Sequence, residues 1–473
     1  MPTHDAIVIG SGPNGLCAAI ELATAGLSVQ VVEARDTIGG GARTEELTLP
    51  GFRHDVCSAI HPMGMISPYL RSLPLAQHGL QWVDPPVALA HPFDDGSASV
   101  LLRDLDATAE RMGQDGSSYR SLLGPFVKHS DAFFREILKP IRIPRHPFLM
   151  ARFGLSALRS CTDLVRRFRH ERTRAIFAGC AAHSVVPLDR LATASFGMVL
   201  AASAHAAGWP CAKGGSQSII TALAAHLRSL GGEISTGLRI ERFDQVSSAR
   251  AVIADLTPRQ LADIAGDRFS PSYQRHLRNF RYGPGVFKID WALSAPIPWK
   301  AADCLQSATV HVGGPIEEIV RGEDEVGRGK HPERPFVLLA QQSLFDPTRA
   351  PSGKHTGWAY CHVPSGSTVD MTAAIERQVE RFAPGFRDVI LSRHTINCVE
   401  LQQHNANMIG GDIGGGANDL VQFLARPLLR WNPYTTPDPH IFLGSSSTPP
   451  GGGVHGMCGY WAARTALRRL FGR

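Results

Sequence analysis

The chain has 473 residues, of which 43% are hydrophobic and 19% charged, so it can bury a core large enough for two or three domains. Its net charge of +6 is modest for this length and argues against dedicated nucleic-acid binding, which usually shows a denser basic patch. The nine scattered cysteines include no CxxC pair, so neither a disulfide framework nor a metal site is expected.

The N-terminus predicts a strand, a glycine-rich turn and a helix. The apolar run 6–9 leads into GSGPNG at 10–15, and a helical pattern follows as far as Gly26. In such a motif the first glycine permits the turn, the second lets the backbone approach a pyrophosphate, and the third lets helix and strand pack closely. The helix N-terminus turns its free amides toward the phosphates. The candidate dinucleotide contacts are Gly10, Gly12, Pro13, Asn14 and Gly15.

An acidic residue follows the second predicted strand, 28–32. Glu33 lies about 20 residues after the first glycine, where a carboxylate can accept hydrogen bonds from a ribose 2′-hydroxyl. That carboxylate would repel the 2′-phosphate of NADP, so FAD or NAD is favoured, although nearby Arg35 weakens the inference. The alternative is an ordinary strand-turn-helix whose glycines serve only the turn.

A second glycine turn follows between Ala34 and Thr44. Three consecutive glycines at 39–41 and the cation of Arg43 suit a further wrap around a pyrophosphate, while a plain surface loop remains the alternative. The candidate cofactor contacts in this turn are Ala34, Gly40, Gly41 and Arg43.

Arginines recur among apolar residues between Arg142 and Arg174. A basic amphipathic helix can lie in an anionic membrane interface and collect a lipid-soluble substrate. The favoured interpretation is a solvated arginine face on a helix that packs on the domain, because such faces are common. The N-terminus leaves no room for a signal peptide and no apolar run approaches the roughly 18 residues of a membrane-spanning helix, so a cytoplasmic protein is expected, with peripheral membrane contact as the open alternative.

Beyond 214 the pattern returns to helix and strand. A helix near 219–230 precedes candidate strands at 233–236 and 249–254. Alternating residues at 286–293 also indicate sheet.

The C-terminus carries a second glycine motif. The apolar run 441–443 leads to Gly444 and Ser445, and Gly451, Gly453 and Gly456 repeat the GxGxxG spacing before a last helix. The chain then ends without room for the strand and acid of a complete NAD site. The helix N-terminus can instead stabilise the anionic pyrimidine end of a reduced flavin. The candidate contacts are Gly444, Ser445, Gly453, Val454 and His455.

Together these segments resemble the phytoene desaturase-like flavoproteins, within the amine oxidase and GDP-dissociation-inhibitor fold group. The resemblance is carried by the first motif, by STPPGGGVHGMCG at 447–459 and by segments at 39–43, 58–62, 214–218, 282–290 and 381–386. The chain is closer to the phytoene dehydrogenase-related oxidoreductases than to dedicated carotenoid desaturases. It departs from its relatives where a β-hairpin over the adenine end is reduced to the region 245–248, and where Ser445 replaces the usual aspartate.

The resemblance implies an α/β fold: a Rossmann-like FAD-binding domain built from separated segments, with a mixed α+β substrate domain. The FAD-binding segments would be 1–67, 206–262 and 437–473, and the substrate domain would comprise a mainly helical part, 68–205, and a sheet-containing part, 263–436.

The implied activity is that of an FAD-dependent dehydrogenase or desaturase. It would take hydride from a C–H bond of an apolar organic substrate and pass the electrons to oxygen, a quinone or another acceptor. Two alternatives stay open: a redox-neutral flavin isomerase, and a non-catalytic prenyl- or lipid-binding protein of the GDP-dissociation-inhibitor type. His455 and His61 are the candidate catalytic residues, and each has a structural alternative, in a loop cap and in a turn respectively.

Overall fold

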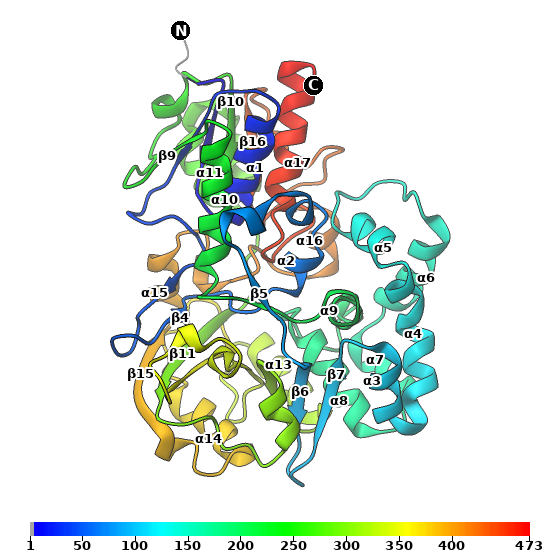
Figure 1. Cartoon of the computed structure of the whole chain (residues 1–473). Helices are drawn as coiled ribbons and strands as arrows, with labels where there is room; N and C mark the ends of the chain where they lie inside the picture. The colour runs from blue at the N-terminus through cyan, green and yellow to red at the C-terminus, as the bar shows by residue number, and fades with distance from the viewer. Residues whose placement is uncertain (1–3) are drawn as a thin grey trace.

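A parallel sheet forms the upper part of the molecule in Figure 1, in the computed structural model that describes residues 4–473. Its strand order is β16-β10-β1-β2-β9. The strands are β1 (Ala6–Ile9), β2 (Val29–Val32), β9 (Glu233–Ser235), β10 (Ala251–Ala254) and β16 (Ile441–Leu443). Three separated parts of the chain therefore build one Rossmann-like sheet, which confirms the predicted fold class.

Helices cover both faces of this sheet, and the apolar strands alternate between the two cores. Val8, Val31 and Ile253 pack with the first, and Ile7, Val252 and Leu443 with the second. Strands that are apolar on both faces are typical of a covered parallel sheet. The first core includes α1 (Pro13–Thr24), α10 (Gln217–Ser229) and α17 (Met457–Ala466), and the second includes α11 (Pro258–Ala265) and α12 (Pro271–Arg278).

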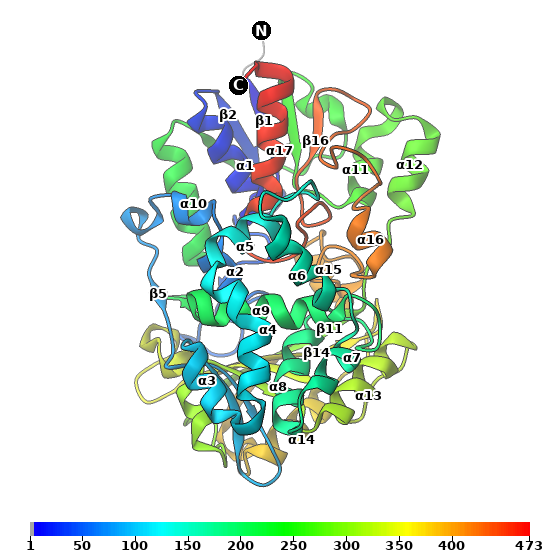
Figure 2. The ribbon, with the colours of Figure 1, turned by 90° about the vertical axis from the view of Figure 1, so that its right-hand side faces the viewer.

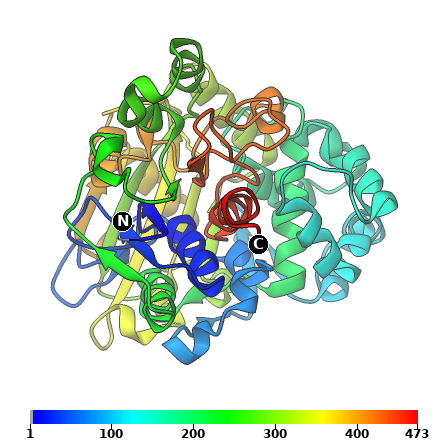
Figure 3. The ribbon, with the colours of Figure 1, turned by 90° about the horizontal axis from the view of Figure 1, so that it is seen from above.

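The two ends of the chain lie side by side. Figure 3, seen from above, shows α1 in blue next to α17 in red, and Figure 2 shows the same pair from the side. A Cβ on Gly459 would lie 1.8 Å from the backbone oxygen of Asn14, so only glycine allows this approach. The N-terminal and C-terminal glycine motifs are thereby held together.

A second, mostly antiparallel sheet forms the lower part of Figure 1, in the order β15-β11-β14-β13-β12-β6-β7. Ile289 and Trp291 of β11 face the apolar side of α14 (Thr372–Phe382), whereas Lys288 and Asp290 face the opposite way. The alternation predicted at 286–293 is therefore part of a strand. The strands are β6 (Val87–Pro92), β7 (Ala98–Leu102), β11 (Gly285–Leu293), β12 (Thr309–Val312), β13 (Val337–Ala340), β14 (His355–Val363) and β15 (Ile390–Ile396).

A helical region lies beside the second sheet, on the right in Figure 1 and toward the viewer in Figure 2. Its centre is the alanine-rich α9, whose residues Met198, Ala201 and Ala204 are fully buried or nearly so. The helices are α2 (Pro62–Ile66), α3 (Leu105–Arg111), α4 (Gly116–Lys128), α5 (Ser130–Ile137), α6 (Pro147–Ala157), α7 (Cys161–Leu164), α8 (Glu171–Ala182) and α9 (Thr193–Ala207).

Shorter elements complete the fold. Two small two-stranded sheets pair β3 (Thr44–Glu45) with β4 (His54–Asp55), and β5 (Trp82–Val83) with β8 (Cys211–Ala212). The remaining helices are α13 (Ile316–Gly327), α15 (Cys398–His404) and α16 (Leu420–Leu424).

The domain limits stay predictions, and the packing of residues 261–277 bears on the limit predicted at 263. Leu261, Phe269 and Leu277 pack into the core of the parallel sheet. We propose that the second substrate-domain segment begins near 280 rather than at 263.

Candidate functional site

A cavity of about 1420 Å³ lies between the two sheets. At one end it is lined by residues at the carboxyl ends of the parallel strands, including Ile9, Val32 and Asp255. At the other end its wall includes Leu338, Trp358 and Tyr360 of the second sheet. The carboxyl edge of a parallel sheet is where such folds bind their ligands.

The first glycine turn forms a cradle against this cavity. Helix α1 begins at Pro13 without a side-chain cap, so its first amides are free for an anion. Gly10, Gly12 and Asn14 line the cavity, and a Cβ on Gly15 would lie 2.0 Å from the oxygen of Gly10. Gly15 is therefore a packing residue outside the cavity wall, and its N–H donates to Asp255 at 3.0 Å.

Glu33 is held in place by the same turn. Its Oε2 accepts hydrogen bonds from the backbone N–H of Ser11 at 3.0 Å and from the Ser11 hydroxyl at 2.6 Å. Its Oε1 accepts from the N–H of Arg35 at 2.9 Å. Glu33 and Ala34 both line the cavity, so the carboxylate is oriented before any ribose arrives.

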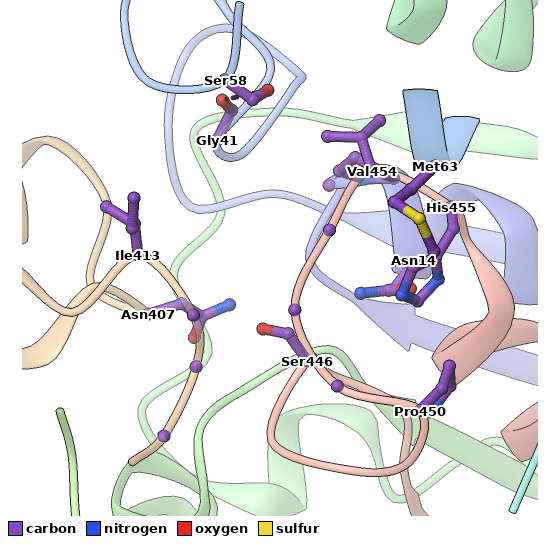
Figure 4. A pocket seen from close by; sticks show the side chains of 18 of the residues that line it. Asn14, Gly41, Ser58, Met63, Asn407, Ile413, Ser446, Pro450, Val454 and His455 are labelled. Atoms are coloured by element: carbon purple, nitrogen blue, oxygen red, sulfur yellow. Dashed lines mark hydrogen bonds between the residues drawn. The ribbon is translucent and has the colours of Figure 1, made fainter. Parts of the chain in front are cut away.

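The second glycine turn packs directly on the first. A Cβ on Gly40 would lie 3.0 Å from the Cα of Gly12, so the two turns meet backbone to backbone. Arg43 is 3% exposed and donates to the carbonyls of Gly40 and Thr37, while its Nε has no partner within residues 4–473. Gly41 lines the cavity beside Ser58, whose hydroxyl donates to its carbonyl (Figure 4). The plain surface-loop interpretation is therefore the weaker one.

Sequence reasoning missed Asp255, which follows β10, the neighbour of the central strand β1. Its carboxyl is buried against the first glycine turn, and burial raises its pKa to about 7. The carbonyl of Asp255 accepts from the side chain of Asn407 at 2.8 Å, which brings the loop after α15 to the cavity (Figure 4). The only sequence signal was an aspartate directly after a short apolar strand.

The C-terminal glycine loop closes the opposite wall. Gly453, Val454 and His455 line the cavity, and Figure 4 shows Val454 and His455 beside Asn14 and Met63. Gly444 and Ser445 do not reach the cavity, because Gly444 packs against Ala462 of α17 and Ser445 is buried in the turn. Ser446 lines the wall in their place.

His455 caps the last helix. Its Nδ1 accepts the backbone N–H of Met457 at 3.0 Å, and its carbonyl accepts the hydroxyl of Ser67 at 2.7 Å. Burial lowers the pKa of His455 to about 4, so the ring is neutral near pH 7. This geometry supports the capping alternative, and a catalytic role stays a prediction.

His61 also has a structural partner. Its Nε2 lies 2.8 Å from the hydroxyl of Ser216, which itself donates to the carbonyl of Ser58 at 2.6 Å. The imidazole therefore donates from Nε2 and joins two loops of the cavity wall. Burial lowers the pKa of His61 to about 4. Its catalytic role also remains a prediction.

A buried ion network beneath these loops was not anticipated. Arg349 is 1% exposed and pairs with Asp55 at 2.9 Å and with Asp346 at 3.1 Å. The two carboxylates also accept the backbone N–H groups of Ser216 and Gly214. Burial alone would raise the pKa of Asp55, but Arg349 and the N–H of Ser216 hold it below its usual value. The network ties the loop after β8 to the second sheet.

The cavity suits FAD at its nucleotide end. Among its wall atoms, Asn14 Oδ1 and Arg43 Nε are buried and lack partners within the described chain. A buried polar atom without a partner costs free energy, so a polar ligand is expected there. Ribose hydroxyls suit the carboxylate of Glu33, and a diphosphate suits the glycine turns and Arg43. The residues present therefore fit the group.

Comparison with known proteins also indicates a nucleotide-binding site. Residues 8–73 match the NAD(P)-binding Rossmann-like domain family. The rat pyridine nucleotide-disulfide oxidoreductase domain-containing protein 2 is 25% identical, covering 99% of this chain and 94% of its own. The lycopene-forming phytoene desaturase of Paracoccus sp. is 22% identical over 96% of this chain and 95% of its own.

The fold recurs in solved structures. A triple mutant of putrescine oxidase superposes with a TM-score of 0.63 at 15% identity, covering 98% of this chain and 99% of that one. At this identity the likeness concerns the fold. Together with the relatives above, it supports the predicted FAD-dependent oxidoreductase.

Proposed function

We propose that this chain is a flavin-dependent dehydrogenase that removes hydride from a C–H bond of a largely apolar organic substrate. The observation that carries the proposal is one continuous cavity that joins the nucleotide cradle to an apolar compartment. Side chains that line this compartment include Phe153, Val199, Leu200, Leu338, Trp358 and Tyr360.

The chain's own residues position the substrate and exclude water. Trp358 and Tyr360 project from the same face of β14, since they are two residues apart on a strand. Both are 7% exposed, so they form a nearly dry wall for an apolar chain. Bound FAD supplies a two-electron acceptor there, and oxygen, a quinone or another acceptor takes the electrons onward.

The test is anaerobic reduction of the FAD-loaded protein. Incubation with a substrate should bleach the visible flavin absorbance, and admission of air or a quinone should restore it. A redox-neutral isomerase would convert its substrate only after prior chemical reduction of the flavin. Turnover confined to pre-reduced protein would therefore overturn dehydrogenation in favour of isomerisation.

We also propose that the cavity mouth docks on an anionic membrane. Ile141, Leu158 and Leu424 line the cavity and are also 61%, 55% and 53% exposed, which places its opening between these segments. Figures 1 and 2 both show α5, α6 and α16 at about mid-height in the molecule.

The rim of this mouth is apolar and basic. On the chain segments that carry these mouth residues, Ile143, Phe148, Leu429 and Trp431 are 92%, 91%, 85% and 96% exposed. Arg142, Arg145 and Arg152 are exposed beside them, and such a combination is typical of surfaces that bind anionic lipid.

The later part of the basic stretch behaves differently. Leu164 and Phe168 are fully buried, so 161–168 has the packed helical face that the sequence favoured. None of the helices in residues 4–473 is both long and apolar enough to cross a membrane. Sedimentation with vesicles of phosphatidylserine and phosphatidylcholine tests the docking, because a protein that stays in the supernatant at low salt contradicts it.

A further inference from the structure

A pair of histidines stands in the wall of the apolar compartment. His183 follows the last residue of α8, and its Nε2 lies 3.1 Å from Nε2 of His311 on β12. His311 is fully buried, whereas His183 lines the cavity. The His183 ring also packs edge-on against Trp209, with ring centroids 6.5 Å apart.

The contact between the two Nε2 atoms requires that one ring donate and the other accept. Nδ1 of His311 is buried and has no hydrogen-bond partner among residues 4–473, and it faces α8 so closely that a Cβ on Gly179 would lie 2.7 Å from it. A proton on that Nδ1 would be a buried donor without an acceptor, which is a rare and costly arrangement. We therefore assign the proton of His311 to Nε2, from which it donates to His183.

This assignment fixes the state of His183. Its Nε2 accepts, so in the neutral ring its proton is on Nδ1. Burial lowers the pKa of His183 to about 3, which keeps the ring neutral near pH 7. That Nδ1 makes no hydrogen bond to the described residues, and it is not completely buried by them. Because His183 lines the cavity, its Nδ1–H is available there as a neutral donor.

Three more polar groups of the apolar compartment lack partners among the described residues, one of them the indole Nε1 of Trp358. Ser184 Oγ and Thr309 Oγ1 are buried and make no hydrogen bond within residues 4–473, although both residues line the cavity. Thr309 and His311 lie two residues apart on β12 and so share one face of the sheet. An otherwise apolar compartment thus contains polar groups that only a ligand or water can satisfy.

We propose that His183 is a specificity-determining hydrogen-bond donor, and that the substrate is an apolar molecule carrying an oxygen acceptor, a carbonyl or hydroxyl, rather than a pure hydrocarbon. The inference rests on the proposed dehydrogenase function and narrows its substrate class. A hydrocarbon would leave the N–H of His183 buried and unpaired, and sites of this kind discriminate strongly against ligands that lack the matching group.

Binding of three isoprenoids with one carbon skeleton tests this proposal. Equilibrium dialysis of FAD-saturated protein against farnesene, farnesol and farnesal measures each affinity without using catalysis. We expect the two oxygenated probes to bind about tenfold more tightly than farnesene. Equal affinities, or no saturable binding of the oxygenated probes, would overturn the proposal. Flavin content is measured separately. A protein that does not bind FAD would contradict the dehydrogenase function, whereas an FAD-loaded protein without the oxygen preference would contradict only the donor role of His183.

Variants sharpen the test. His183→Phe keeps an aromatic ring but removes the donor, and should abolish the preference for oxygen. His183→Gln keeps an N–H and should retain part of it. Phe153→Leu, elsewhere in the cavity wall, is the control and should shift all three affinities alike.

The tautomers of His183 and His311 can be determined on the native protein, without a variant and without a ligand. Nitrogen-15 NMR of histidine-labelled native protein should find the His183 proton on Nδ1 and the His311 proton on Nε2 near neutral pH. The reverse pattern would remove the donor and with it the proposal.

Discussion

The two ends of the cavity are built by different means. At the nucleotide end, backbone approaches backbone: Gly40 meets Gly12 and Gly459 meets Asn14, with a few side chains such as Glu33 fixed by backbone amides. At the substrate end, side chains from the turn after α8, from β12 and from β14 converge, and the contact between His183 and His311 fixes the proton of the proposed donor. The cofactor is thus bound mainly by short glycine turns that are local in sequence. The substrate end is instead lined by side chains that come together only when distant parts of the chain fold.

Removing the cation of the buried ion network, which connects the two ends of the cavity, should give the largest effect, a loss of stability. Arg349→Met leaves the carboxylates of Asp55 and Asp346 buried without their cation. The free energy of unfolding should fall by about 3–5 kcal/mol, measured by urea denaturation. Arg328→Met, at a pair whose arginine is 69% exposed, is the control and should change stability by less than about 1 kcal/mol. Equal effects of the two variants would show that the network does not join the ends.

The nucleotide end can be tested through Glu33. Glu33→Gln removes a charged acceptor for ribose hydroxyls, so FAD affinity should fall by about 2 kcal/mol, or about thirtyfold. Fluorescence titration of apoprotein with FAD measures this. Glu46→Gln, at an exposed neighbour, should bind as the native chain does. Unchanged affinity in the Glu33 variant would remove this residue from the site.

The mouth of the substrate end can be tested on vesicles. Replacing both Phe148 and Trp431 by serine should lower the fraction bound to anionic vesicles about tenfold or more. Replacing Val369 and Leu391, which are 46% and 48% exposed elsewhere, serves as the control. If both double variants bind equally, the rim is not the docking surface.

The smallest expected effect is the pH dependence of stability and FAD affinity that arises from protonation of Asp255. Its folded pKa of about 7 exceeds the usual 3.8, so the fold favours the protonated acid, and stability falls as pH rises from about 4 through 7. Above pH 7 the carboxylate repels a diphosphate, so FAD affinity should decline several-fold between pH 6 and about 8. Asp255→Asn should flatten this dependence, measured by the same fluorescence titration. A native profile that is already flat would contradict the assignment.

The same contrast explains what could be predicted from sequence. Glycine spacing and apolar runs are local, so both glycine motifs and the strands around Val8, Ile253 and Phe442 could be located. Asp255, Arg349 and the His183–His311 pair could not, because each acquires its role from partners far away in the chain. Ser445 was placed one residue from the true wall residue, Ser446, since a turn's side-chain directions depend on its backbone path.

Flavin content of the purified chain addresses the central claim most directly. If the paired glycine motifs form one dinucleotide site, protein incubated with FAD and then gel-filtered should be yellow and carry FAD in a stoichiometric amount. Gly459→Leu, which forces α17 away from Asn14, should lose that colour. Folded native protein that emerges colourless even after incubation with millimolar FAD would contradict the account.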